Sequence, residues 1–464
     1  MKITELENVE IVDWAAEGKA IAKEGSMVIF VKDAIPGDIV NLRVKRKKNY
    51  AEGAVTKLIK PSPDAIEPVC PHFGDCGGCV SQRMSYAEQL KYKEKQVVEQ
   101  LRRIGGINSP LVNPIIPSAN TVFYRNKLEF TFSCRKWLTA SDVDTDGANG
   151  NALGFHVSGR YDKALDIEKC MLQRSPSNEI RNEVKKYAIN RGYEFYDVKN
   201  RTGFLRNLIV RTASTGDVMV IVVFAYFDKI RIHDFMNMIK DRFSITSLNY
   251  MINEKLNDSI NDSDTVLFSG KPFIEEKMED LTFRIGAKSF YQTNSEQAHN
   301  LYKIVRQYAG LQGNETVYDL YTGTGTIACF IAKNAGKVAG IEYVADAVAD
   351  AEVNASLNGI SNVSFYAGDI KNVLNQEFIQ ANGSPDIVIL DPPRAGLHPS
   401  IPKILLESAA PEKIIYVSCN PATQARDIAI LSDKYQLIES QPVDMFPHTF
   451  HVENVALLRK FHTF

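Results

Sequence analysis

Two apolar segments in the C-terminal third of the chain each end at residues that could take part in chemistry. Residues 387–390 lead into Asp391-Pro-Pro-Arg394, and residues 415–417 lead into Ser418-Cys419-Asn-Pro. Short apolar runs that stop at a proline are typical of buried strands. In an open α/β sheet such strand ends face the crevice in which ligands bind. A carboxylate, a guanidinium and a thiol in one crevice suit addition chemistry on a pyrimidine ring. The alternative is that Cys419 is a small buried thiol of the core.

Residues 316–332 predict a strand, a glycine turn and a helix, with the turn at Tyr321-Thr-Gly323-Thr-Gly325-Thr326. The third glycine of the dinucleotide-binding fingerprint is absent, since Ala328 stands at its position. Nicotinamide binding is therefore disfavoured.

Acidic residues close the strands that follow this turn. Glu342 ends the predicted strand 338–342, 19 residues after Gly323, and Asp369 ends the predicted strand 363–369. Carboxylates at these positions can bind ribose hydroxyls and an adenine amino group. Each acid alone could be a helix N-cap. Together they resemble the way in which S-adenosylmethionine-dependent methyltransferases hold their methyl donor.

A bound methyl donor and a crevice cysteine together indicate methylation of a ring carbon. C5 of uracil is a poor nucleophile until a thiolate adds to C6, and a base must then remove the C5 proton so that the thiolate can leave. A free cysteine has a pKa of about 8.5, and we expect Arg394 to lower it. Enzymes that methylate exocyclic amines commonly carry an aromatic residue after Asn/Asp-Pro-Pro, so Arg394 disfavours that alternative.

Four segments resemble signatures of the RNA (uracil-5-)-methyltransferase family, RumA/TrmA type: residues 289–294, 391–396, 418–423 and 444–453. The resemblance implies that Cys419 is the nucleophile and Glu453 the base for the C5 proton. Without it, Glu453 would be interpreted as a solvated strand charge. Together with Gly323 of the glycine turn, the residues that the resemblance places at the cofactor are Gln292, Tyr321, Thr326, Glu342, Asp369 and Asp391. We expect the two histidines of residues 444–453, His448 and His451, to be structural.

A second cluster of reactive residues is the spacing Cys70-x5-Cys76-x2-Cys79, with Cys170 as the candidate for a fourth ligand. Three clustered cysteines and a distant one suit a cubane iron–sulfur cluster, and zinc is the alternative. The resemblance extends to the ribosomal-RNA branch of the family, which implies a 4Fe–4S cluster on these four cysteines. We expect a structural or RNA-facing role for it.

Composition agrees with a multidomain globular protein, because 44% of the 464 residues are hydrophobic and 24% are charged. The absence of an apolar run of membrane-spanning length and of a leader pattern predicts a cytoplasmic protein, and we expect a monomer. The net charge of −2 gives no general attraction to nucleic acid. Residues 41–60, however, carry seven Lys or Arg against one Glu. This basic stretch is typical of an OB-like RNA-binding barrel and resembles a TRAM domain, although lysines also guard ordinary edge strands.

The predicted organisation is multidomain α/β. An OB-like barrel spans residues 1–60, and a central α+β domain with the iron–sulfur cluster spans 61–288. A Rossmann-like class I methyltransferase domain spans 289–464, and part of 95–123 is expected to pack on it. Within the central domain we expect a helix over 86–103, a strand over 127–134, and RNA contacts from residues 124–127.

The predicted function is S-adenosyl-L-methionine-dependent methylation of C5 of a uridine in 23S ribosomal RNA. The alternatives are a transfer RNA uracil-5 methyltransferase and an RNA-binding or assembly factor with a methyltransferase fold.

Overall fold

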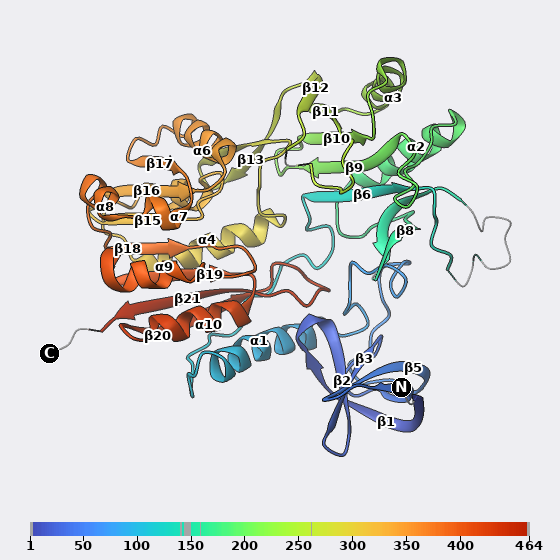
Figure 1. Ribbon diagram of the computed structural model, residues 1–464, viewed down its shortest axis with the longest axis horizontal. Coiled ribbons are helices and arrows are strands. Elements are labelled where there is room, and N and C mark those ends of the chain that lie inside the picture. The colour runs from blue at the N-terminus through green and yellow to red at the C-terminus, as the bar shows by residue number, and fades with distance from the viewer. Residues whose placement is uncertain (1–2, 140–141, 143–149, 158, 261, 462–464) are drawn as a thin grey trace.

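The computed structural model describes residues 3–139, 142, 150–157, 159–260 and 262–461. The described residues form a small barrel, a seven-stranded middle sheet, a two-stranded hairpin and a seven-stranded C-terminal sheet. In Figure 1 the C-terminal sheet lies on the left, the middle sheet at the upper right and the barrel at the lower right. No helix among the described residues is long and apolar enough to cross a membrane.

The N-terminal barrel is closed in the strand order β1-β2-β3-β5-β4. Its strands are β1 (Ile3–Ala15), β2 (Lys19–Glu24), β3 (Met27–Lys32), β4 (Ile39–Arg46) and β5 (Ala51–Lys60). Alternate residues of β4 (Val40, Leu42 and Val44) point into the barrel core, while its basic residues lie outside. The period-two pattern explains why the basic stretch can be exposed without disturbing the core. The predicted N-terminal barrel is confirmed.

The middle sheet has seven strands in the order β12-β11-β10-β9-β6-β7-β8. They are β6 (Lys127–Ser133), β7 (Ala152–Val157), β8 (Arg160–Asp166), β9 (Leu205–Thr212), β10 (Val218–Phe224), β11 (Ser247–Ile252) and β12 (Thr265–Gly270). Helices α2 (Ser177–Asn190) and α3 (Lys229–Arg242) bury apolar residues against one face. Ile209, Ile221 and Val223 of the other face belong to a core cluster that reaches into the C-terminal part. The central strands are therefore buried on both faces, which explains their continuous apolar sequence.

The C-terminal sheet has the order β17-β16-β15-β18-β19-β21-β20. Its strands are β15 (Thr316–Leu320), β16 (Lys337–Glu342), β17 (Val363–Ala367), β18 (Ile387–Leu390), β19 (Lys413–Ser418), β20 (Tyr435–Val443) and β21 (Glu453–Lys460). The first five in this order run parallel, and β21 is antiparallel to both its neighbours. Chain order reverses between β15 and β18, which is the switch point where doubly wound sheets bind ligands. The predicted Rossmann-like arrangement is confirmed, although β17 ends at Ala367 and stops two residues short of Asp369.

Helices cover both faces of this sheet (Figure 1). They are α4 (Ser295–Ala309), α5 (Thr326–Ala332), α6 (Ala345–Leu357), α7 (Ile370–Val373), α8 (Gln376–Asn382), α9 (Ser400–Ile404) and α10 (Pro421–Leu431). A hairpin of β13 (Phe273–Met278) and β14 (Leu281–Gly286) shares the core cluster of α4 and α5.

Helix α1 (Tyr86–Arg103) also packs on the C-terminal sheet, although it precedes the middle sheet in sequence. Its Val97 and Leu101 lie in one core cluster with Tyr318 and Tyr416 of the sheet. The segment after it bridges β20, with Val112 beside Ser440 and Ile116 beside Val443. The chain thus contacts the C-terminal sheet, leaves to build the middle sheet, and returns.

Candidate active site

The predicted nucleophile, Cys419, and the predicted base, Glu453, lie at adjacent strand ends. Strand β19 pairs with β21 in antiparallel register, with Ser418 opposite Asn454. Cys419 directly follows β19 and Glu453 is the first residue of β21, so the two lie beside the last pair of this register, and the charge of Glu453 acts on the Cys419 thiol. On its other side β19 is parallel to β18, which ends at Leu390 directly before Asp391. The sheet therefore brings a thiol and two carboxyl groups to one edge.

Burial sets the protonation of these three groups. Burial, with Asp391 nearby, raises the pKa of Glu453 to about 8. Burial and the neighbouring Asp319 raise the pKa of Asp391 to about 7. For Cys419, burial followed by the charges of Glu453 and Asp391 raises the pKa to about 11, and Arg394 opposes this only in part. The expectation that Arg394 lowers the pKa of this thiol below its ordinary value is thus wrong, because burial and two acids outweigh one guanidinium.

Arg394 is held beside the thiol by the residues that follow it. Its backbone oxygen accepts hydrogen bonds from Asn420 Nδ2 at 3.1 Å and from Thr423 Oγ1 at 3.2 Å. Its guanidinium Nη2 lies 3.3 Å from His451 Nε2. Burial, then the charges of Arg394 and two other cations, lowers the pKa of His451 to about 4. A neutral imidazole can accept a hydrogen bond from Arg394. His451 therefore orients the guanidinium without adding a second positive charge beside it.

The glycine turn between β15 and α5 follows the end of β15, which pairs with β18 up to Leu320 opposite Leu390. Gly323 N–H donates to Glu342 Oε2 at 3.1 Å, and Glu342 Oε1 accepts from Val344 N–H at 2.9 Å. Gly325 has a φ of +74°, and a Cβ there would lie 2.8 Å from Ala351 and Phe365 side chains. Only glycine fits this conformation and this close approach. The start of α5 therefore packs tightly against α6 and β17, whereas a Cβ at Gly323 would meet nothing within 4 Å, so the turn is open at that residue.

The remaining predicted cofactor residues surround this turn. Tyr321 precedes it with a φ of +66°, and Thr326, the first residue of α5, shares a 3.0 Å hydrogen bond with Tyr302 OH. Gln292 lies in residues 289–294, the segment before α4, which we call the cofactor loop. Asp369 caps α7, since its carboxylate accepts from Lys371 N–H at 3.2 Å, and it lies 3.0 Å from Lys371 Nζ. In this state Asp369 is the helix N-cap that its sequence also allowed.

Asp319 is a site residue that was missing from the predicted set. It lies in β15 next to Leu320, and its carboxylate accepts from Thr322 Oγ1 at 2.6 Å. Burial raises its pKa to about 7. Its buried Oδ1 has no hydrogen-bond partner among the described residues. An unpartnered buried carboxylate oxygen beside an open glycine turn fits the ammonium group of an amino-acid ligand. Its position at the end of β15 was the available signal.

The four cysteines predicted as ligands line one pocket at the edge of the middle sheet. Cys70, Cys76 and Cys79 come from the loop before α1, and Cys170 from the segment after β8. Burial raises the pKa of Cys76 to about 12 and that of Cys79 to about 11. Among the described residues, no three His, Cys, Asp or Glu side chains already stand in the geometry of a metal site. The fold thus gathers four soft donors in one pocket without fixing them around an ion.

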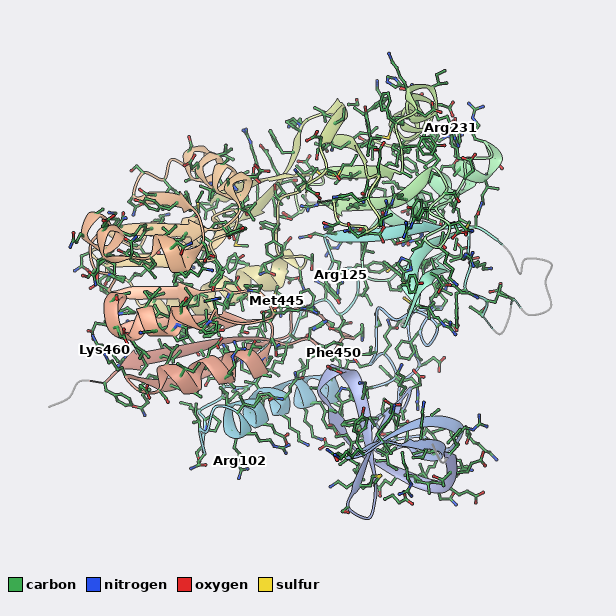
Figure 2. All side chains as sticks on the ribbon, in the orientation of Figure 1. Arg102, Arg125, Arg231, Met445, Phe450 and Lys460 are labelled. Carbon is green, nitrogen blue, oxygen red and sulfur yellow. The ribbon has the colours of Figure 1, made fainter. Side chains whose placement is uncertain are left out.

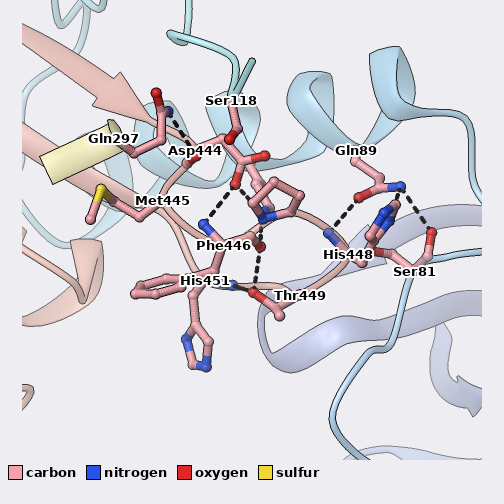
Figure 3. A network of polar contacts seen from close by, with 12 residues as sticks. Ser81, Gln89, Ser118, Gln297, Asp444, Met445, Phe446, His448, Thr449 and His451 are labelled. Carbon is pink, nitrogen blue, oxygen red and sulfur yellow. Dashed lines mark hydrogen bonds and ion pairs between the residues drawn. The ribbon is translucent and has the colours of Figure 1, made fainter. Parts of the chain in front are cut away.

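Residues 444–452, which we call the catalytic loop, connect β20 to Glu453 and are held by a buried polar network (Figure 3). Lys93 Nζ of α1 lies 2.5 Å from Asp444 Oδ1 and donates to Phe446 O at 2.9 Å. Gln89 accepts from His448 N–H at 3.0 Å, and its amide nitrogen lies 3.3 Å from His448 Nδ1. From the other side, Gln297 Nε2 donates to Asp444 O at 2.9 Å. Helix α1 and helix α4 therefore fix the loop that ends at Glu453.

The chain is similar to known RNA methyltransferases. Residues 265–461 match the family model described as tRNA (Uracil-5-)-methyltransferase. The chain is 55% identical to an RNA methyltransferase of Bacteroides thetaiotaomicron over 96% of this chain and 99% of that protein. It is 40% identical to one of Chlorobaculum tepidum over 97% of this chain and 95% of that protein.

A solved structure has the same overall arrangement. It is the Pyrococcus abyssi tRNA (uracil-54, C5)-methyltransferase in complex with S-adenosyl-L-homocysteine, with a TM-score of 0.75 and 28% identity. The match covers 97% of this chain and 100% of that one. The chain belongs to the RumA/TrmA-type family of RNA (uracil-5-)-methyltransferases and is an S-adenosyl-L-methionine-dependent RNA methyltransferase.

Proposed function

We propose that this protein methylates C5 of a specific uridine in 23S ribosomal RNA through a covalent bond between Cys419 and C6. The observation that carries the proposal is that Cys419, Glu453 and Asp391 come together at the ends of adjacent strands, where the charges of both acids act on the thiol. A nucleophile and a base at adjacent strand ends can act on neighbouring carbons of one ring. The family supports this use of the crevice.

Two residues of this chain carry out the proposed reaction, Cys419 as the nucleophile and Glu453 as the base. The target uridine leaves its stack, which costs a few kcal/mol that contacts to the RNA backbone offset. Cys419 gives up its thiol proton to solvent and Sγ bonds to C6, so that the electron pair of the C5–C6 double bond makes C5 nucleophilic. When bound, S-adenosyl-L-methionine supplies the methyl group that C5 receives and is left as S-adenosyl-L-homocysteine. The ionised form of Glu453 then takes the C5 proton, the C5–C6 double bond re-forms, and Cys419 leaves as the thiolate. A carboxylate with a raised pKa is a stronger base than an exposed glutamate, which suits this task.

We assign cofactor binding to the residues around the glycine turn. Glu342 and Asp369 would hold the ribose and the base, while Asp319 would face the amino-acid part. Gln292, Tyr321, Thr326 and Asp391 complete the set. The unpartnered Oδ1 of Asp319 supports this assignment.

The four-cysteine pocket is proposed to hold a 4Fe–4S cluster. Cys70, Cys76, Cys79 and Cys170 supply four thiolates, the donors that such clusters prefer. Ligation would require their side chains to turn toward a common centre, and zinc bound to the same thiols is the alternative. Iron and sulfide analysis of anaerobically purified protein separates the two metals.

The barrel is proposed to bind RNA through its basic face. Part of that charge is neutralised within the barrel, since Arg46 lies 2.7 Å from Glu24 and Lys47 lies 3.4 Å from Glu52. Lys45 and Lys48 are exposed and remain for phosphate contacts. Reversing both charges, Lys45→Glu with Lys48→Glu, should weaken RNA binding and reduce its salt dependence, while Lys240→Glu on α3 serves as the control.

Transfer RNA is the second candidate substrate, because the similar Pyrococcus abyssi structure is that of a tRNA methyltransferase. The four-cysteine pocket supports ribosomal RNA through the resemblance to the ribosomal-RNA branch. Mass mapping of 5-methyluridine in both RNAs from a deletion strain decides between them. Loss of one 5-methyluridine from 23S RNA supports the first proposal, and loss from transfer RNA alone supports the second.

A further inference from the structure

Three consecutive residues of the middle part contact both loops of the active site. RNA contacts from residues 124–127 stay a prediction. In the structure, Tyr124 is buried with 7% of its surface exposed, and Asn126 points toward the C-terminal part. Figure 2 shows Arg125 near the centre of the molecule, where its guanidinium lies over the ring of Phe446 of the catalytic loop.

Asn126 binds the cofactor loop with its side chain and its backbone. Its Nδ2 donates to Gln292 O at 2.9 Å and to Ser295 Oγ at 2.9 Å. Its backbone N–H donates to Thr293 O at 2.7 Å. These bonds enclose Gln292, the cofactor-loop residue assigned to the methyl donor, so the backbone of that residue is fixed from outside its own domain.

Tyr124 and Arg125 bind the catalytic loop. Tyr124 OH donates to Pro447 O at 3.0 Å, and the Arg125 guanidinium lies over the Phe446 ring, 5.2 Å from its centroid. Asn294 Nδ2 also joins the two loops by donating to Met445 O at 3.0 Å. The same short segment therefore holds the loop that carries Gln292 and the loop that ends at Glu453.

The segment is itself anchored to the middle part. Phe123 N–H donates to Met171 O at 2.7 Å, and Arg125 N–H donates to Leu172 O at 2.8 Å. Thr212 N–H donates to Asn126 O at 2.9 Å, which ties the segment to the end of β9. Bonds on both sides make it a rigid connection and not a loose loop.

We propose that Tyr124 and Asn126 are positioning residues: Asn126 fixes the cofactor loop for binding of the methyl donor, and Tyr124 fixes the catalytic loop for attack on the uridine. This inference rests on the proposed function, since it acts through Gln292 and Glu453. It separates two effects. Asn126 should govern cofactor affinity, and Tyr124 should govern the rate of adduct formation.

The test of Asn126 uses calorimetric titration of the full chain with S-adenosyl-L-homocysteine. Asn126→Asp keeps the shape of the side chain, removes its two donated bonds and faces an oxygen toward Gln292 O. We expect affinity to fall about tenfold, equivalent to about 1.4 kcal/mol and thus to one or two lost hydrogen bonds. The matched control is Asn358→Asp, which removes bonds of the same kind from Asn358 Nδ2 to Thr282 O and Asn354 O. The control should lower the melting temperature without changing affinity.

Two results would overturn the role of Asn126. Affinity could stay within twofold of the wild type, or both Asn→Asp variants could weaken binding equally. If Asn126→Asp does not fold, Asn126→Ala is measured with the same expectation. Gln292→Ala separates this inference from the proposed function. If Gln292→Ala weakens binding and the Asn126 variants do not, only the positioning role is wrong. If Gln292→Ala has no effect, the cofactor assignment is wrong and this inference falls with it.

Tyr124→Phe tests the second half. It removes one hydroxyl and keeps the buried ring, so the fold should persist. We expect adduct formation with 5-fluorouridine RNA to slow about fivefold, the effect of about one hydrogen bond, with S-adenosyl-L-homocysteine affinity within twofold of the wild type. An unchanged rate, or an equal loss in affinity, would contradict the assignment.

Discussion

The buried pair of Lys93 and Asp444 should be among the most sensitive stability determinants of the chain. Lys93 is 4% exposed and Asp444 is fully buried, and Asp444 has Tyr86 OH at 2.8 Å as its other side-chain partner. Lys93→Met keeps the aliphatic stem and removes the charge, so Asp444 stays buried without its cation. Breaking a buried pair from one side costs about 3–5 kcal/mol. Burial lowers the pKa of Lys93, because desolvation disfavours the charged form of this lysine. The opposite charge of Asp444 counteracts this shift.

Urea unfolding of Lys93→Met measures this cost, and helix α1 supplies a matched control. Lys91 lies 2.9 Å from Glu88 on the same helix, but its side chain is 63% exposed. Lys91→Met should therefore cost less than about 1 kcal/mol. A loss in Lys93→Met no larger than in Lys91→Met would refute the reasoning. Because Lys93 also donates to Phe446 O, the Lys93 variant should lose activity at temperatures where it is still folded.

The sequence predicted the parts of the fold that depend on local pattern. The helix over 86–103, the barrel strands and the apolar strands that end at Asp391 and Cys419 follow from periodicity and proline breaks, and the structure has them. Contacts between distant residues could not be predicted in this way. Lys93 and Asp444 are 351 residues apart, and no periodic pattern relates them.

Electrostatics and orientation were also beyond the sequence. The pKa of Cys419 depends on burial and on two acids from other strands. A prediction based on Arg394 alone therefore gave the wrong direction for the pKa shift. Asn126 is a residue type that can contact RNA, yet its side-chain amide donates a hydrogen bond to Gln292 O of the cofactor loop. A residue's type shows what it can bind, and only the fold determines which partner it meets.

Three further predictions follow from the site. Because burial raises the pKa of Glu453 from 4.5 to about 8, the folded state binds this proton more tightly than the unfolded chain. The stability of the wild type should therefore fall relative to that of Glu453→Gln as the pH rises from 4.5 to about 8. Melting temperatures of the two proteins that change in parallel over this pH range would refute the pKa shift. Cys170→Ser should reduce the iron content of anaerobically purified protein from about four atoms per chain, while Cys134→Ser, outside the pocket, should keep it; equal iron in both would exclude Cys170 as a ligand. Gly325→Ala should lower the melting temperature and weaken S-adenosyl-L-homocysteine binding, because its Cβ would clash with Ala351 and Phe365 at a φ of +74°; unchanged binding would contradict the role of the glycine turn.

The most direct test of the central claim is intact-protein mass spectrometry after incubation with 5-fluorouridine RNA and S-adenosyl-L-methionine. A base can remove a proton from C5 but cannot remove fluorine in the same way. The C5–C6 double bond therefore does not re-form, and the cysteine stays bonded to C6. The wild type should gain the mass of the methylated RNA, and peptide mapping should locate the bond at Cys419. Cys419→Ala should gain no mass and show no turnover on unmodified RNA. A covalent adduct at another residue, or normal turnover in Cys419→Ala, would contradict the account.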